Sequence, residues 1–176
     1  GLEADFLAGH SLGELAAWAF AGAMTFEQAL EIATARGRAM GRAARSTKGG
    51  MLAVKNTDGE ELQELLETGQ VEGHLSVGAY NAPQETVLSG ALPALQAITP
   101  LCESRRLPVE GAWHSPLMEC AKVEFEAALQ ALKCEQLTYP VVSGCDGAVV
   151  TDSSEIKPRL LAQLTEPLRW TAVLST

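Results

Sequence analysis

The first residues in the chain that could do chemistry are a serine and the two glycines around it. Residues 9–13 read Gly-His-Ser-Leu-Gly, between a short apolar run and a stretch rich in alanine and leucine. A G-x-S-x-G pattern between a strand and a helix is typical of a nucleophile elbow, where glycine permits a sharp turn that exposes the serine hydroxyl. The amides and dipole of the following helix can stabilise an oxyanion. We therefore expect Ser11 to be a nucleophile, and the alternative is a glycine-rich turn without chemistry.

A serine nucleophile needs a base, and the chain contains three histidines. His10 adjoins the serine, so its side chain is expected to point away across the turn and to shape the elbow. His74 lies in a polar stretch that is typical of a solvated loop. His114 lies where the chain returns from the last predicted strand of an insertion to the main domain, beside a cleft. This position favours His114 as the base, and the alternative is a histidine that caps the helix starting at Pro116.

The elements that must hold these residues indicate an α/β protein. Thr25 and Gln28 have the spacing of a capping box, which predicts that a helix starts at residue 26 and runs to about residue 44. The other main-domain elements expected from periodicity and turn residues are strands at 5–9 and 140–144 and helices at 13–23, 116–132 and 154–164.

Gly49 and Gly50 mark a change to shorter elements. The expected order there is strand, helix, two strands, helix and strand, which suggests a ferredoxin-like subdomain. The predicted ranges are strands at 51–54, 75–80, 86–89 and 105–109, and helices at 59–66 and 92–102. We therefore expect an α/β catalytic domain formed by residues 1–48 and 111–176, with the subdomain inserted at 49–110.

The composition argues against several classes of protein. Of the 176 residues, 47% are hydrophobic and 20% are charged, which suits a globular chain with a buried core. The formal net charge of -9 disfavours nucleic acid and an anionic membrane as partners. The sequence contains neither a run of about 18 apolar residues nor the basic, apolar start of a signal peptide, so we expect a soluble cytoplasmic protein.

The cysteines are predicted to be reduced structural thiols, and the alternative is a cysteine nucleophile. The four residues are Cys102, Cys120, Cys134 and Cys145. They are too widely spaced for a CxxC zinc site, and a chain of this size does not need disulfides. None is bracketed by glycines as Ser11 is, which disfavours the thiol nucleophile, and the spacing predicts no metal site.

Five motifs in order resemble those of malonyl-CoA:acyl-carrier-protein transacylases, a pattern shared by the acyltransferase domains of polyketide synthases. The motifs are Gly-His-Ser-Leu-Gly-Glu at 9–14, Ala-Arg-Gly-Arg-Ala-Met at 35–40, Asn-Ala-Pro-Gln at 81–84 with Val-Leu-Ser-Gly at 87–90, Trp-His-Ser-Pro-Leu-Met at 113–118, and Gln-Leu at 163–164 with Pro167 and Trp170. The resemblance covers essentially the whole chain. It implies an α/β-hydrolase-like large domain with a ferredoxin-like insert, in agreement with the predicted elements.

The resemblance also implies a role for individual residues. Ser11 becomes acylated, and His114 is its general base. Arg36 binds the free carboxylate of the malonyl group, for which a guanidinium fork is suited; the alternative is a surface arginine on a polar helix face. An Arg-Gly pair inside a helix argues against that alternative, because glycine costs about 1 kcal/mol there relative to alanine and suggests close packing.

Further site residues follow from the same resemblance. The backbone carbonyl of Gln163 orients the histidine, and the alternative for Gln163 is packing at a helix end. Leu12 contributes its backbone amide to the oxyanion hole. His10 and Asn81 belong to the substrate-binding set. Trp113 stands where relatives often have phenylalanine or serine, and it is expected to crowd an α-methyl branch.

The implied reaction moves a malonyl group from coenzyme A to the phosphopantetheine thiol of an acyl carrier protein, in fatty acid or polyketide biosynthesis. Malonyl-CoA is the substrate, and no permanently bound cofactor is expected. The alternatives are an acyl hydrolase acting on carrier-protein thioesters, which would not need Arg36, and a non-catalytic docking domain of a synthase. The family's N-terminal Gly-Gln-Gly segment and C-terminal glycine-rich stretch are absent from these residues, so we expect a fragment.

A cluster of basic residues stands out in this acidic chain. Between residues 36 and 48 there are five basic residues and no acidic one: Arg36, Arg38, Arg42, Arg45 and Lys48. The spacing of Arg38, Arg42 and Arg45 places them on one helix face. The cluster is either a solvated face or a surface that attracts the phosphates of coenzyme A or an acidic carrier protein.

Overall fold

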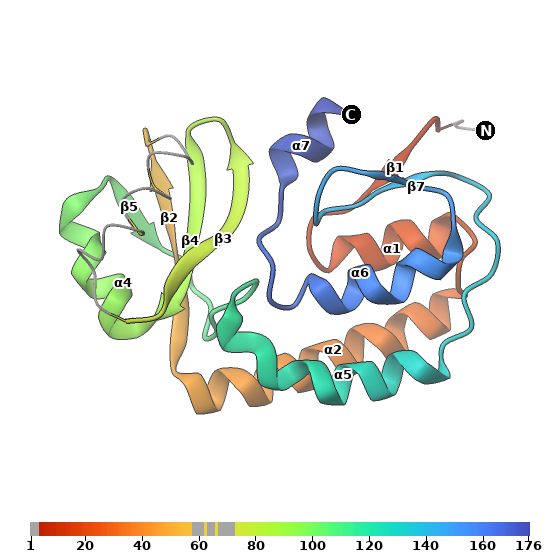
Figure 1. Ribbon diagram of the computed structural model, residues 1–176, viewed down its shortest axis with the longest axis horizontal. Coiled ribbons are helices and arrows are strands. Elements are labelled where there is room, and N and C mark those ends of the chain that lie inside the picture. Colours follow the sequence, from red (N-terminus) through yellow and green to blue (C-terminus); the bar gives the residue numbers. More distant parts are fainter. Residues whose placement is uncertain (1–3, 58–61, 63–65, 67–72) are drawn as a thin grey trace.

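The computed structural model describes residues 4–57, 62, 66 and 73–176, which form two sheets with helices around them (Figure 1). The strands are β1 (Leu7–Ala8), β2 (Gly49–Lys55), β3 (Leu75–Ala82), β4 (Glu85–Ala91), β5 (Ser104–Arg106), β6 (Val141–Val142) and β7 (Val149–Val150). The helices are α1 (Gly13–Phe20), α2 (Phe26–Thr47), α4 (Leu92–Ile98), α5 (Glu119–Ala131), α6 (Ile156–Ala162) and α7 (Trp170–Ser175). The chain is an α/β protein, as expected.

The two sheets differ in topology. The first has three strands in the order β1-β6-β7, with β1 parallel to β6 and β6 antiparallel to β7. The second has four antiparallel strands in the order β3-β4-β2-β5. Helices α1, α2, α5 and α6 lie with the first sheet, and α4 packs on β2 and β4 of the second (Figure 1).

Helix α2 begins where the sequence predicts. The Thr25 hydroxyl accepts the Gln28 amide hydrogen, and the Gln28 side chain accepts the Thr25 amide hydrogen, so the capping box is confirmed. The helix runs to Thr47, three residues beyond the predicted end. It stops at Lys48, whose left-handed backbone turns the chain directly into β2.

Several elements are shorter than predicted, and local chemistry accounts for the main differences. The predicted helix 92–102 ends at Ile98 and continues as a 3-10 turn, because Pro100 has no amide hydrogen for a helical bond. The predicted helix 13–23 ends at Phe20, shortly before Gly22 with a φ of 85°. The predicted strand 105–109 is only Ser104–Arg106, and Pro108 cannot donate to a ladder beyond it.

Other predictions need smaller changes. The predicted helices 116–132 and 154–164 each begin with a 3-10 turn before α5 and α6. The predicted strands 5–9 and 140–144 shrink to the two-residue strands β1 and β6. Strand β7 and helix α7 were not predicted, and the predicted helix 59–66 lies outside the described residues except for Leu62 and Leu66.

A backbone connection joins the two parts of the molecule beside the functional residues. The Leu168 amide donates to the Gly78 carbonyl at 2.9 Å, and the Tyr80 amide donates to the Leu168 carbonyl at 2.8 Å. The segment after α6 therefore runs along the edge strand β3. This contact fixes the four-stranded sheet against the end of α6, where Gln163 lies.

Within the described residues, no helix has both the length and the apolar character needed to cross a membrane.

Candidate active site

Ser11 lies at the turn between β1 and α1 with a left-handed backbone, at a φ of 53°. This conformation costs a non-glycine residue about 1–3 kcal/mol, so the surrounding structure must enforce it. A Cβ at Gly9 would overlap the backbone of Gly13, so glycine is required at position 9. A Cβ at Gly13 would meet nothing within 4 Å. The tight turn at Ser11 therefore requires glycine at position 9 but not at position 13.

Ser11 and His114 are brought together from positions 103 residues apart, with 2.8 Å between Ser11 Oγ and His114 Nε2. The other ring nitrogen, Nδ1, lies 2.7 Å from the backbone oxygen of Gln163. A carbonyl oxygen can only accept, so Nδ1 carries the hydrogen and Nε2 is left to accept the serine hydroxyl hydrogen. His114 also has a left-handed backbone, at a φ of 58°. The histidine is therefore in the orientation that a base for Ser11 requires.

The environment keeps His114 neutral. Burial and, to a lesser extent, the positive charge of Arg36 together lower its pKa to about 3, and the Gln163 carbonyl opposes the shift. The imidazole is thus in its basic form across the physiological pH range. It takes no proton from solvent before it takes one from Ser11.

Arg36 lies beside Ser11 and His114, and its side chain is buried, with an exposed fraction of 6%. Its Nη2 donates to Ser11 Oγ at 3.2 Å and to Gln163 Oε1 at 3.1 Å. Its Nε is buried and has no acceptor among the described residues. Burial lowers the pKa of Arg36 to about 10, so the guanidinium is still charged at neutral pH. A solvated position on a polar helix face, the alternative for this residue, is therefore wrong.

The sequence also suggested that Gly37 is needed for close packing, and this prediction is wrong. Gly37 is exposed, and a Cβ there would meet nothing within 4 Å. Close packing therefore does not account for an Arg-Gly pair in the middle of α2. The burial of Arg36 comes instead from the elements that face it, which carry Ser11 and Gln163.

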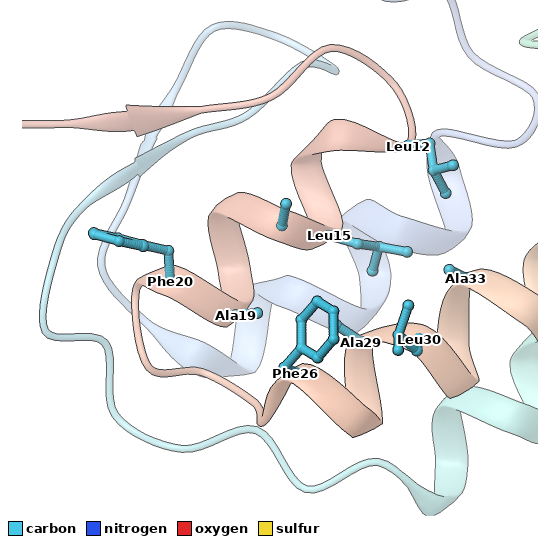
Figure 2. Close-up of a pocket in the computed structure, with 9 residues that line it drawn as sticks. Leu12, Leu15, Ala19, Phe20, Phe26, Ala29, Leu30 and Ala33 are labelled. Atoms are coloured by element: carbon cyan, nitrogen blue, oxygen red, sulfur yellow. The ribbon is translucent and has the colours of Figure 1, made fainter.

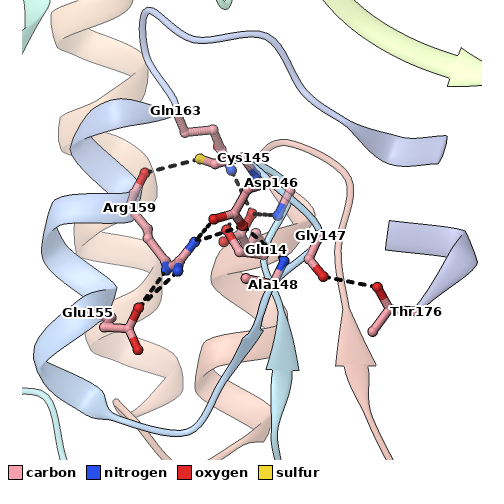
Figure 3. Close-up of polar contacts among 11 residues, drawn as sticks. Glu14, Cys145, Asp146, Gly147, Ala148, Glu155, Arg159, Gln163 and Thr176 are labelled. Carbon is pink, nitrogen blue, oxygen red and sulfur yellow. Dashed lines mark hydrogen bonds and ion pairs between the residues drawn. The ribbon is translucent and has the colours of Figure 1, made fainter. Parts of the chain in front are cut away.

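Glu14 is part of the site and was not singled out from the sequence. It is 1% exposed, and its Oε2 accepts hydrogens from Gln163 Nε2 at 2.7 Å and from the Gly144 amide at 3.0 Å (Figure 3). Burial raises its pKa to about 7, against the Gly144 amide and the charge of Arg159, which lower it. The sequence did hold a signal, since Glu14 is the one charged residue in the otherwise apolar run 13–20.

Comparisons with known proteins place the chain in a family. The model of the family described as "Acyl transferase domain" matches residues 1–154, which is most of the chain. The chain belongs to the acyl transferase domain family.

Individual relatives of this acyl transferase domain are transacylases. The malonyl CoA-acyl carrier protein transacylase of Bacillus subtilis (strain 168) is 33% identical over 177 residues, covering 97% of this chain and 56% of that protein. The crystal structure of the malonyl-CoA:ACP transacylase of Synechocystis sp. PCC 6803 superposes with a TM-score of 0.90 at 29% identity, over 99% of this chain and 59% of that one. A malonyl-transacylase in complex with a type II PKS acyl-carrier protein gives a TM-score of 0.92 at 26% identity, over 99% and 59%. The chain thus spans little more than half the length of these proteins.

Two further predicted residues of the acyl transferase domain contact each other beside the elbow. His10 Nε2 lies 3.0 Å from Asn81 Oδ1, which can only accept, so the imidazole donates. The His10 ring meets the edge of Trp170 at 5.2 Å between centroids. His10 therefore contacts the sheet and the segment after α6. That its side chain points away from Ser11 stays a prediction.

Leu12 and Trp113 are the remaining predicted residues. Leu12 follows Ser11 at the start of α1, and in the part of the chain that the structure describes its amide donates to no other group. Trp113 is half-buried, its ring lies against Gly111, and its carbonyl accepts the Ser89 hydroxyl hydrogen at 2.6 Å. The effect of Trp113 on a branched acyl group stays a prediction.

An apolar pocket of about 430 Å3 lies between α1 and α2 (Figure 2). It begins at Leu12 and includes the exposed rings of Phe20 and Phe26, but neither Ser11 nor His114. It therefore adjoins the Ser11 site at Leu12 but does not contain the nucleophile or its base. Within the described ranges, no group of three or more His, Cys, Asp or Glu side chains could hold a metal ion.

Proposed function

We propose that the chain carries the catalytic centre of a malonyl-CoA:acyl-carrier-protein transacylase. The observation that carries the proposal is the position of Ser11 Oγ, which contacts both the neutral His114 at 2.8 Å and the buried cation Arg36 at 3.2 Å. A serine and histidine alone suit any acyl group, whereas a buried guanidinium beside the nucleophile suits an acyl group that ends in a carboxylate.

In the proposed reaction, His114 Nε2 takes the hydroxyl proton as Ser11 Oγ forms a bond to the thioester carbonyl carbon. The charge that develops on the carbonyl oxygen is stabilised by the Leu12 amide at the start of α1. The intermediate collapses, the carbon–sulfur bond breaks, and the leaving thiolate of coenzyme A takes the proton from His114. The product is a malonyl ester of Ser11.

The second half of the reaction repeats these steps with a different thiol. His114 takes the proton of the carrier protein's phosphopantetheine thiol, whose sulfur attacks the ester carbonyl. Ser11 leaves and recovers the proton, and the malonyl group is now a thioester of the carrier protein. The Gln163 carbonyl keeps the histidine in the tautomer that both half-reactions need, through its 2.7 Å contact with Nδ1.

The remaining site residues receive supporting roles in this proposal. Arg36 holds the malonyl carboxylate. His10 and Asn81, bonded at 3.0 Å, hold the elbow against the four-stranded sheet at the substrate side. Trp113 limits the space for a branched acyl group.

The finer description of the fold is part of the same proposal. Residues 1–48 and 111–176 form an α/β-hydrolase-like catalytic domain, and residues 49–110 form a ferredoxin-like insert. The antiparallel order β3-β4-β2-β5 and the position of α4 between β4 and β5 support the insert. The turn at Lys48 from α2 into β2 supports its first boundary.

The substrate and partner follow from the relatives. Malonyl-CoA and an acyl carrier protein appear in the names of the relatives, and one solved structure has a transacylase in complex with a carrier protein. We propose the same substrate and partner here, in fatty acid or polyketide biosynthesis. The absence of a permanent cofactor and the cytoplasmic location stay predictions.

The proposal is tested by the intact mass of the protein after mixing with malonyl-CoA, with Ser11→Ala as the matched control. We expect the wild-type protein to gain one malonyl group and Ser11→Ala to gain none. Loss of the thioester without an adduct would instead indicate an acyl hydrolase. If malonyl-CoA stays intact and no adduct forms, the result would support a non-catalytic docking domain of a synthase.

A further inference from the structure

The side chain of Gln163 lies between two buried ionisable groups. Its Oε1 accepts from Arg36 Nη2 at 3.1 Å, and its Nε2 donates to Glu14 Oε2 at 2.7 Å (Figure 3 shows the Glu14 side). Glu14 and Gln163 are each 1% exposed. A primary amide has one accepting and one donating end, so a cation on one side and a carboxyl on the other fix its orientation.

From this geometry we propose that Glu14 and the side-chain amide of Gln163 are positioning residues for Arg36, and that selectivity for a dicarboxylic acyl group depends on them. The inference rests on the proposed function, because it concerns the acyl group that Arg36 binds. Neither residue touches the substrate in this account. Glu14 holds Gln163, and Gln163 holds Arg36.

Arg36 needs such support because it has few other partners. Nη2 makes both recorded contacts of the guanidinium, to Gln163 and to Ser11, and Nε has no acceptor among the described residues. Without the Gln163 oxygen, Ser11 Oγ would be the remaining acceptor in the described part of the chain. An arginine side chain has many rotamers, and a displacement of about 1 Å at a site of this kind can cost about 100-fold in rate.

Gln163 serves the site through two separate groups. Its backbone oxygen contacts His114, and its side-chain amide contacts Arg36 and Glu14. A substitution changes the amide and leaves the backbone oxygen in place. The two effects can therefore be separated: loss of the amide should alter the choice of acyl group while the histidine keeps its orientation.

Glu14 offers a matched pair of substitutions. Glu14→Gln keeps an oxygen that can accept from Gly144 and from Gln163, whereas Glu14→Leu removes it. Because burial raises the pKa of Glu14 to about 7, the neutral carboxyl is populated at neutral pH, and a neutral amide is a fair substitute for it. The positioning role therefore predicts that Glu14→Gln is tolerated and Glu14→Leu is not.

The test is to measure kcat and KM for malonyl-CoA and for acetyl-CoA with the full chain, in the wild type and in four variants. For Gln163→Met and Glu14→Leu we expect kcat/KM for malonyl-CoA to fall about 10- to 100-fold, mainly through KM, because a carboxylate contact is present in both the bound and the transition state. The loss for acetyl-CoA should be smaller, so that the ratio of kcat/KM for malonyl-CoA to that for acetyl-CoA falls about 10-fold or more. Glu14→Gln should change this ratio much less than Glu14→Leu does.

Ser115→Ala is the control, since the Ser115 hydroxyl is buried beside His114 but donates only to the Ala112 carbonyl. Any change in kcat/KM that Ser115→Ala causes should be the same for malonyl-CoA and for acetyl-CoA. Parallel losses for malonyl and acetyl groups in Gln163→Met would overturn the inference, because a merely structural role predicts them. If Glu14→Leu does not fold, Gln163→Met and Glu14→Gln decide the question. A wild-type protein that forms no malonyl ester in the same assay would overturn the proposed function and the inference together.

Discussion

Helix α2 carries arginines on two sides, and the two environments are opposite. Arg36 faces the nucleophile, is 6% exposed and has a pKa lowered to about 10 by burial. Arg38, Arg42 and Arg45 face outward and are exposed, and Arg42 pairs with Glu124 of α5. Electrostatic interactions are strong where water is excluded and weak where water and salt screen them. The same residue type should therefore determine substrate choice on one side of the helix and act only at long range on the other.

The largest effects are expected on the inner side, at the nucleophile and its base. Ser11→Ala should abolish formation of the acyl-enzyme, because no other hydroxyl occupies that position. His114→Ala should slow acylation by about 100- to 10,000-fold and leave the fold intact. Rapid-quench measurement of labelled acyl-enzyme, with circular dichroism as the check on folding, gives both values. Label that remains covalently attached in Ser11→Ala would remove Ser11 from its role.

The next effect compares Arg36 directly with Arg38, an exposed arginine two residues further along the same helix. Arg36→Ala should weaken malonyl transfer by about 2–5 kcal/mol and raise the relative activity on acetyl-CoA, which has no carboxylate. Arg38→Ala should leave the ratio of the two activities unchanged. Competition assays with both thioesters measure this ratio. Equal losses on the two substrates in Arg36→Ala would contradict the assignment.

The buried environment of His114 should also affect the pH dependence of acylation. For a histidine with an ordinary pKa of 6.5, the fraction in the basic form would fall about 25-fold between pH 7 and pH 5. The pKa of His114 is lowered to about 3, so its basic form persists there and the acylation rate should be nearly unchanged between pH 7 and pH 5. Single-turnover rates across this range provide the check. A midpoint near pH 6.5 would show that His114 is more solvated than the structure indicates.

On the outer side, a smaller and salt-dependent effect is expected. Reversing Arg38 and Arg45 to Glu should lower the association rate of an acidic carrier protein by about 10-fold at low salt and flatten its salt dependence. These two residues are preferred over Arg42 because its reversal would also place a glutamate against Glu124. Stopped-flow measurements over a salt series decide the point. An unchanged salt slope would mean that the outer arginines are simply a solvated face.

The smallest effect concerns stability on the outer side. Gly37 is exposed, and a Cβ there meets open space, so Gly37→Ala should raise the free energy of unfolding by about 0.5–1 kcal/mol. Chemical denaturation of wild type and variant measures the difference. A destabilised variant would show that this part of α2 is more closely approached than the structure indicates.

The sequence predicted elements whose signals are local. The capping box of Thr25 and Gln28 contains its own partners within four residues, and α2 begins where it predicts. Helix α7 was missed because it is short and has no capping side chain, and β7 was missed because two valines give too short a pattern. The ends of α4 and β5 depend on proline positions, Pro100 and Pro108, that were read as part of longer elements.

The residues of the candidate site likewise differ in whether a local sequence pattern predicts them. Ser11 and Gly9 are neighbours in the sequence, so their turn could be recognised from a pentapeptide. The contacts of Glu14 could not, because its partners Gly144 and Gln163 lie 130 and 149 residues away. The resemblance to a family pointed to the backbone of Gln163, but only the three-dimensional structure brings its side chain between Glu14 and Arg36.

Ser11 is proposed to pass a malonyl group from one thiol to another. The most direct measurement is a chase of the isolated, labelled malonyl-enzyme with a carrier protein that bears phosphopantetheine. We predict that the label moves from Ser11 to the pantetheine thiol, and that it moves much more slowly when the carrier protein lacks the prosthetic group. Release of the label as free malonate at the same rate with and without the carrier protein would contradict the account.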